Sequence, residues 1–227
     1  MKKHIPNTLT CLNLFSGCIG VLFALEGEFL YVFYCILASG IFDFFDGMVA
    51  RALHVKSNIG KELDSLADMV SFGFLPGTIL FMLFKEASDA AYLPYIAFLV
   101  TVFSALRLAK FNIDERQTTD FIGLNTPMNT FFIISLPFIA QQYPQLVYNV
   151  PVLLVITVGT SLLLVSEIKL FSMKLTTMAW YPNRFKYIFL MISVLLLIVF
   201  KFVALPFVLL IYIVMSLLHF AQEKAVK

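Results

Sequence analysis

Long apolar stretches separated by short polar segments follow one another along the whole chain. A membrane-spanning helix needs about 20 mainly apolar residues, and most of these stretches reach or approach that length. The pattern therefore predicts an all-α, polytopic membrane helix bundle with about eight transmembrane helices. We expect them at residues 9–25, 29–53, 58–84, 91–112, 127–140, 147–165, 186–201 and 204–220, of which 127–140 is short.

No internal repeat or low-complexity tract divides the chain, so we expect a single integral membrane domain over residues 1–227. Within it, core catalytic helices would occupy about residues 5–165, and two extra C-terminal spans about 186–220. The first apolar stretch is long, and no small-residue cleavage site precedes Glu26. We therefore interpret it as a retained span and not as a cleaved signal peptide.

Composition agrees with this class. The chain is 60% hydrophobic and 13% charged, with a mean hydropathy of +0.91, whereas soluble domains carry about 25% charged residues. An odd number of cysteines without a Cys-x-x-Cys pair argues against a disulfide framework. No stretch interleaves basic and aromatic residues, so nucleic acid is not an expected partner.

The basic residues indicate an orientation. If the N-terminus is cytoplasmic and the spans alternate, only Lys85 and Lys201 of the 16 lysines and arginines lie outside. Cytoplasmic loops of membrane proteins carry such an excess. The chain is thus expected in the cell (inner, cytoplasmic) membrane with both termini cytoplasmic. The cytoplasmic set is Lys2, Lys3, Arg51, Lys56, Lys61, Arg107, Lys110, Arg116, Lys169, Lys174, Arg184, Lys186, Lys224 and Lys227.

Four carboxylates interrupt the second and third apolar stretches: Asp43, Asp46, Asp64 and Asp68. A charged side chain at membrane depth is costly, so such residues usually face a polar cavity and are functional candidates. Both pairs are spaced three or four residues apart, which puts each pair on one helix face. The orientation above places all four near the cytoplasmic headgroups, with the candidate active site facing the cytoplasm.

Hard cations such as Mg²⁺, Mn²⁺ or Ca²⁺ prefer carboxylate oxygens. With only Arg51 and Lys61 nearby, four aspartates would repel one another unless a cation joined them. Gly47 and Gly60 leave room for a bulky ligand, and the arginine fork suits phosphate. The combination predicts phosphate-ester chemistry on an amphiphilic substrate. The alternative is a set of structural ion pairs, although one or two cations cannot neutralise four aspartates.

The segment from Asp43 to Asp68 reads D-x-x-D-G-x-x-A-R-x8-G-x3-D-x3-D. It resembles the complete signature of the CDP-alcohol phosphotransferases. The resemblance implies six core membrane helices, usually a homodimer, and an active site open to the cytoplasmic leaflet. It also implies that Asp43, Asp46 and Asp64 bind Mg²⁺ or Mn²⁺, with two ions per site and Ca²⁺ as an alternative. Asp68 would be the general base and also lie in the metal shell.

The same resemblance assigns residues to the CDP-linked lipid. A Pro-Asn-x-x-Thr segment near the N-terminus matches a family motif, although such a segment alone is equally typical of a helix cap. The implied CDP-lipid-binding residues are Asn7, Thr10, Gly47, Ala50, Arg51 and Gly60.

The acceptor alcohol depends on weaker signals. Arg107 and Lys110 end a predicted helix level with the aspartates, and Ser71 follows Asp68 by one turn. The segments LRLAKFN and LDSLADMVSFGFLPG, with a G-L-x-x-P loop, resemble the phosphatidylserine synthases within this family. The resemblance implies transfer of a phosphatidyl group from CDP-diacylglycerol to L-serine. Glycerol 3-phosphate or inositol phosphate stays open as the acceptor, and a divalent metal transporter is the alternative of another class.

Overall fold

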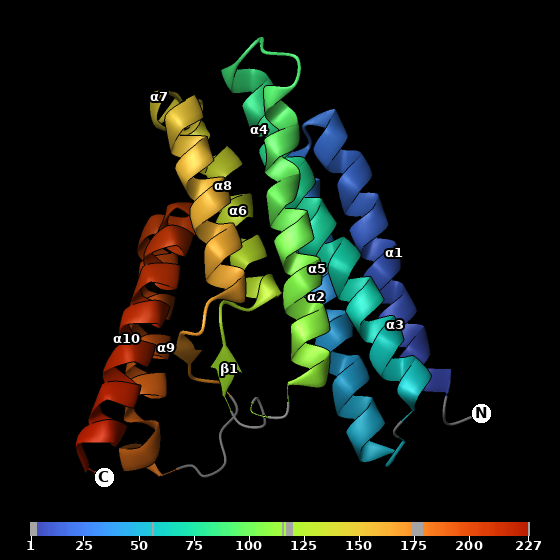
Figure 1. Ribbon diagram of the computed structural model, residues 1–227, viewed down its shortest axis with the longest axis vertical. Helices are drawn as coiled ribbons and strands as arrows, with labels where there is room; N and C mark the ends of the chain where they lie inside the picture. The colour runs from blue at the N-terminus through green and yellow to red at the C-terminus, as the bar shows by residue number, and fades with distance from the viewer. Residues whose placement is uncertain (1–3, 56, 115, 117–119, 174–178, 227) are drawn as a thin grey trace.

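A computed structural model describes residues 4–226 except 56, 115, 117–119 and 174–178. It is a bundle of α-helices, as predicted (Figure 1). The helices are α1 His4–Glu26, α2 Phe29–Ala52, α3 Asn58–Asp68, α4 Leu75–Ala87, α5 Leu99–Ile113, α6 Thr126–Ala140, α7 Pro144–Val147, α8 Val150–Val165, α9 Trp180–Phe200 and α10 Ala204–Val226.

Helices occupy all eight predicted positions, with bounds that differ by several residues. Among the described residues, five stretches are long and apolar enough to cross a membrane, and α6 and α8 are shorter apolar helices. The last of the five, Asn183–Gln222, includes most of α9 and most of α10. These two helices are joined by the short 3₁₀ turn Lys201–Val203, where Lys201 has a φ of +49°.

The third predicted span is one continuous helix of three segments, an α-helix, a π-helix and a second α-helix. A π-helix, Met69–Phe74, joins α3 to α4 directly after Asp68, the last of the four clustered aspartates. A π-turn shifts the backbone hydrogen-bond pattern, and other groups can then bond its carbonyls. Here Thr130 donates to the Phe72 carbonyl at 3.1 Å and Thr101 to the Gly73 carbonyl at 3.0 Å. The sequence pattern did not predict this irregularity, which commonly marks functional sites.

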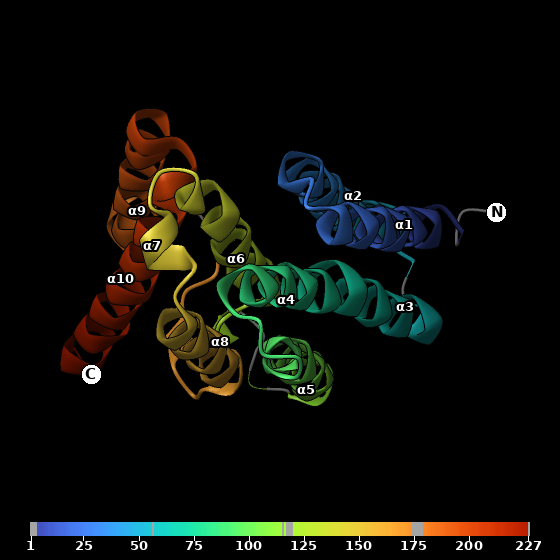
Figure 2. The same cartoon turned by 90° about the horizontal axis from the view of Figure 1, so that it is seen from above.

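Helix α4 lies near the middle of the bundle when it is seen from above (Figure 2). The pair α1 and α2 packs on one side of it, α5 and α8 on another, and α6 separates it from α9 and α10. The core consists of apolar side chains from these helices, among them Ile36, Phe72, Leu75, Ile79, Leu80, Phe84 and Ile133, all fully buried.

Close helix contacts depend on small residues. A Cβ at Gly17 of α1 would lie 2.3 Å from the Ser71 Oγ and 2.9 Å from the Ser71 Cα, so α1 touches the π-helix there. A Cβ at Gly77 of α4 would lie 2.3 Å from the Thr101 Oγ1 on α5. Helices α1 and α5 therefore both approach closely the stretch of helix that follows Asp68.

A two-stranded antiparallel ribbon, β1 Phe121–Ile122 with β2 Lys169–Leu170, joins two loops at one end of the bundle. Gly123 follows β1 with a φ of +76°, and a Cβ there would lie 2.6 Å from the Leu164 carbonyl oxygen. Only glycine tolerates that conformation and that approach. The ribbon was not predicted, because its strands are too short to produce a sequence pattern.

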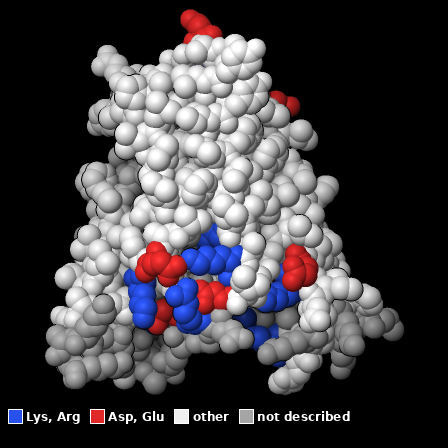
Figure 3. Space-filling model, viewed as in Figure 1, with Lys and Arg blue, Asp and Glu red and all other residues white. Residues whose placement is uncertain are grey.

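The two ends of the bundle differ in charge. On the face in Figure 3, basic and acidic side chains gather near one end, whereas only acidic ones appear at the other. Both chain termini and the β-ribbon lie at the charge-rich end (Figure 1). Of the predicted cytoplasmic residues, Lys2, Lys3, Lys56, Lys174 and Lys227 and the side chain of Lys224 lie outside the described part.

Candidate active site

Two helix ends bring the four aspartates together. Asp43 and Asp46 lie near the end of α2, and Asp64 and Asp68 lie on α3, which returns into the bundle. Ser57 caps α3, because its hydroxyl accepts the Gly60 N–H at 2.9 Å. A short connection and a defined cap therefore fix the two acidic faces against each other.

Asp43, Asp64 and Asp68 each offer one oxygen, and these three oxygens lie within 4.8 Å of one another. The Asp64 Oδ1 is buried without a hydrogen-bond partner. No salt bridge among the described residues involves any of the four aspartates. Structural ion pairs would need basic partners for these aspartates, and the described residues provide none within salt-bridge distance. The cluster of carboxylate oxygens instead fits a hard divalent cation.

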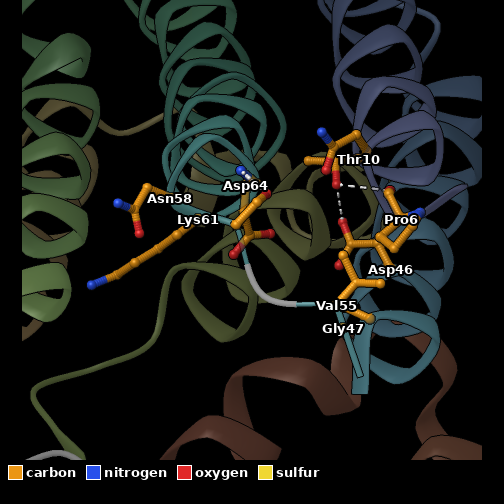
Figure 4. Close-up of a pocket in the computed structure, with 12 residues that line it drawn as sticks. Pro6, Thr10, Asp46, Gly47, Val55, Asn58, Lys61 and Asp64 are labelled. Carbon is orange, nitrogen blue, oxygen red and sulfur yellow. Dashed lines mark hydrogen bonds between the residues drawn. The ribbon is translucent and has the colours of Figure 1, made fainter. Parts of the chain in front are cut away.

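Asp46 is held from α1. The Thr10 hydroxyl donates to the Asp46 Oδ2 at 2.6 Å, and Asp46 is only 6% exposed. The hydrogen bond is drawn as a dashed line in Figure 4. Thr10 was predicted to contact the CDP-lipid, and here it also orients one of the predicted metal ligands.

Asn13, one turn after Thr10, was missed by the sequence reasoning. Its Nδ2 donates to the Asp68 Oδ1 at 3.2 Å, and the residue is fully buried. The main-chain carbonyl of Asn13 accepts hydrogen bonds from the Ser39 hydroxyl at 3.1 Å and from the Ser71 hydroxyl at 3.0 Å. The only sequence signal was the i, i+3 spacing from Thr10, which places both residues on one face of α1.

A first cavity of about 410 Å³ lies between the ends of α1, α2 and α3 (Figure 4). Five of the six residues predicted for the CDP-lipid line it, together with Asp46 and Asp64: Asn7, Thr10, Gly47, Ala50 and Gly60. A Cβ at Gly60 would lie 3.2 Å from the Asn7 Oδ1. The glycines therefore keep this cavity open where two helices approach.

Two basic residues, Arg51 and Lys61, lie near this cavity, and their side chains have different surroundings. Arg51 is not among its lining residues, and its Nη1 lies 3.3 Å from the position of a Cβ at Gly47, which does line the cavity. The Lys61 side chain extends away from Asp46 in Figure 4, and its Nζ donates to the Asn112 carbonyl at 2.5 Å.

A second cavity, of about 620 Å³, lies on the other side of the aspartates. Arg107 of α5 lines it and is 7% exposed, with its Nε unpartnered and its guanidinium 5.2 Å from the Phe111 ring centroid. Asp64 lines both cavities. The remaining lining residues are Asp43, Phe44, Ser65, Asp68, Leu108, Phe111, Asn112, Phe121, Asn125, Pro127, Met128, Ser172, Met173 and Tyr212.

The other two predicted acceptor residues lie elsewhere. The buried Ser71 hydroxyl donates to the Asn13 carbonyl and lines neither cavity, because the π-helix turns it towards α1. Lys110 pairs with Glu167 at 2.5 Å on the exposed loop side. That hydrogen bond, together with the charge of Arg116, lowers the pKa of Glu167.

A sequence profile of CDP-alcohol phosphatidyltransferases matches residues 3–163, which include all four aspartates and helices α1 to α7. The chain belongs to this family. The CDP-alcohol phosphatidyltransferase match ends at residue 163, so α9 and α10 lie beyond it.

Curated relatives of this CDP-alcohol phosphatidyltransferase carry the name CDP-diacylglycerol–serine O-phosphatidyltransferase. The Bacillus subtilis protein is 36% identical over 173 residues, which cover 74% of this chain and 89% of the relative. The Methanocaldococcus jannaschii protein is 33% identical over 186 residues, covering 82% and 79%. For the Mycobacterium leprae protein, 33% identical, the match covers 72% of this chain but 57% of the relative. The predicted family is confirmed.

Proposed function

We propose that this membrane enzyme transfers the phosphatidyl group of CDP-diacylglycerol to the hydroxyl of L-serine, giving phosphatidylserine and CMP. The observation that carries the proposal is the position of Asp64 between two cavities, within 4.8 Å of the oxygens of Asp43 and Asp68. A transferase with two substrates needs such a junction, because donor and acceptor must meet at one phosphorus. The names of the relatives support serine as the acceptor.

The first cavity would hold the cytidine diphosphate. Its glycines allow close approach, and its volume of about 410 Å³ lies in the range of small-molecule sites. The residues that we propose to contact the CDP-lipid are Asn7, Thr10, Gly47, Ala50 and Gly60, with Arg51, next to Gly47, contributing its guanidinium fork to a phosphate.

Asp43, Asp46, Asp64 and Asp68 would hold Mg²⁺ or Mn²⁺, as two ions per site, with Ca²⁺ as an alternative. Bound there, the cations would neutralise the negative charge of the diphosphate and of the leaving CMP. The protein's part is to keep the carboxylates in place: Thr10 holds Asp46 at 2.6 Å and Asn13 holds Asp68 at 3.2 Å. Outer contacts of this kind set the orientation of metal ligands.

Asp68 would accept the proton of the serine hydroxyl as its oxygen attacks the β-phosphorus. The bond between that phosphorus and the bridging oxygen breaks, and CMP leaves with the electron pair. Phosphoryl transfer requires positioning and charge neutralisation more than covalent help from the protein. We therefore propose direct in-line transfer without a phosphoryl-enzyme intermediate.

The second cavity would hold the acceptor. The buried Arg107 guanidinium, with an unpartnered Nε, fits the serine carboxylate. In this proposal Lys110 contributes positive charge at the loop side through its pair with Glu167, and Ser71 contributes indirectly by fastening α1 to the π-helix.

The membrane arrangement is part of the proposal. The excess of basic residues at the end that holds the aspartates supports a cytoplasmic active site and cytoplasmic termini. The family resemblance supports a homodimer, with catalysis in residues 5–165.

An acceptor panel tests the function. Purified protein in vesicles with CDP-diacylglycerol and Mg²⁺ or Mn²⁺ is given L-serine, glycerol 3-phosphate or inositol phosphate in turn, and CMP is measured. We expect rapid CMP release with serine alone. CMP release with glycerol 3-phosphate and none with serine would show that serine is not the acceptor. Metal flux without CMP release would show that the protein is a transporter and not this enzyme.

A further inference from the structure

The C-terminal hairpin, α9 and α10, lies beyond the family match yet reaches the second cavity. Of its described residues, Tyr212 alone lines that cavity. Tyr212 is 2% exposed and stands on the face of α10 that packs towards α6 and β2. A polar side chain at that depth needs a partner, and its choice of partner limits what else it can bind.

The Tyr212 hydroxyl donates to the Phe171 carbonyl at 2.8 Å. The two rings also meet edge to face, with centroids 5.3 Å apart and planes at 84°. One turn further along α10, the Ser216 Oγ accepts the Phe171 N–H at 3.3 Å. The phenol is thus fixed in direction, and because it has a single hydrogen, its oxygen remains available only as an acceptor.

The charges around this oxygen are unequal. The phenol interacts electrostatically with Arg107 and with Asp120, while Arg107 also interacts with Asp68. Asp120 in turn accepts the Ser172 N–H at 3.2 Å, and Ser172 lines the same cavity. An anionic group of the ligand is best placed at Arg107, and a cationic group at the phenol oxygen on the Asp120 side.

We propose that Tyr212 is a specificity-determining residue that accepts a hydrogen bond from the ammonium group of the amino-acid acceptor. This rests on the proposed function. The serine carboxylate then binds Arg107, the hydroxyl faces Asp68, and the ammonium faces Tyr212. Three different groups of one small molecule are recognised by side chains from α5, α3 and α10, so the hairpin completes a site that the family core leaves open on that side.

Tyr212→Phe tests the proposal, because it keeps the ring and removes only the oxygen. We expect the KM for L-serine to rise about tenfold, as for the loss of one hydrogen bond to a charged group. The KM for CDP-diacylglycerol should not change. The KM for 3-hydroxypropanoate, which lacks the ammonium but keeps the carboxylate and hydroxyl, or its inhibition constant if it is not an acceptor, should also stay the same.

Ser216→Ala is the matched control. It removes the other hydrogen bond to Phe171 without touching the cavity, so it should lower the thermal midpoint as much as Tyr212→Phe while leaving the KM for serine unchanged. Equal effects of the two substitutions on that KM would overturn the proposal, since Tyr212 would then act only through Phe171. An equal effect of Tyr212→Phe on serine and on 3-hydroxypropanoate would overturn it as well.

The outcomes separate the two proposals. If the unsubstituted protein releases no CMP with serine, both the proposed function and this inference fail. If it transfers to serine and Tyr212→Phe leaves the KM for serine unchanged, the inference alone fails.

Discussion

Asp68 is held by Asn13, whose amide donates to one of its oxygens, and the other two cluster oxygens lie close by. Asp68→Asn keeps the shape and removes the proton acceptor. We expect turnover to fall by about 10²-fold or more, while the protein still binds Mn²⁺, measured by calorimetry. Asp89→Asn, at the exposed opposite end, is the control and should keep full activity. Retained turnover in Asp68→Asn would show that Asp68 is not the general base.

Asn13 carries no charge and lines neither cavity, so we expect it to influence activity through its hydrogen bond to Asp68. Asn13→Ala should lower kcat/KM by about 10- to 100-fold, as substitutions behind metal ligands do. Ser39→Ala removes only a hydrogen bond to the Asn13 carbonyl and should change kcat/KM much less. If the two variants behaved alike, Asn13 would be a packing residue and not a support of Asp68.

The predictions from sequence were best where contacts are local. Asp43 with Asp46, and Asp64 with Asp68, share helix faces because the helical repeat determines it. Asn13 is 55 residues from Asp68, and Phe171 is 41 from Tyr212. Such contacts depend on how helices pack, which a single sequence does not reveal. The contact of Ser71 with α1 depends on packing in the same way, since the π-helix turns this side chain towards α1.

The contact between α1 and the π-helix links the fold to the site. Because Gly17 admits Ser71 so closely, Asn13 can reach Asp68 one turn away. Gly17→Ala should destabilise the protein by about 1–3 kcal/mol through overpacking and also lower activity, both measurable in detergent. Gly40→Ala on α2 is the control, because a Cβ there meets nothing within 4 Å. Equal thermal midpoints for the two variants would contradict this account of the packing.

Across the whole molecule, charge is concentrated where the chemistry is proposed. Three carboxylates with no salt-bridge partner among the described residues are costly without a counter-ion. Removal of divalent cations with EDTA should therefore abolish CMP release, and Mg²⁺ or Mn²⁺ should restore it. The thermal midpoint should rise on adding the cation, because a ligand that binds only the folded state stabilises it. Full activity in EDTA would exclude the proposed metal role.

The positions of the eight predicted spans and the gathering of charge at one end of the bundle followed from hydropathy and charge, because the membrane imposes length and orientation on each span. The β-ribbon and the inward side of α10 did not follow. Both depend on a few hydrogen bonds between distant loops, such as Gly123 N–H to the Ile168 carbonyl at 2.8 Å. These features shape the second cavity, which is why the donor side was easier to predict than the acceptor side.

We propose that the phosphatidyl group passes from CDP-diacylglycerol to serine at the aspartate cluster. The most direct measurement uses radiolabelled L-serine in vesicles that contain the purified protein, CDP-diacylglycerol and Mn²⁺, and quantifies the label in lipid and the released CMP in the same reaction. We expect phosphatidylserine and CMP in equal amounts, with neither formed by Asp68→Asn. CMP released without serine entering lipid, or phosphatidylserine formed equally well by Asp68→Asn, would contradict it.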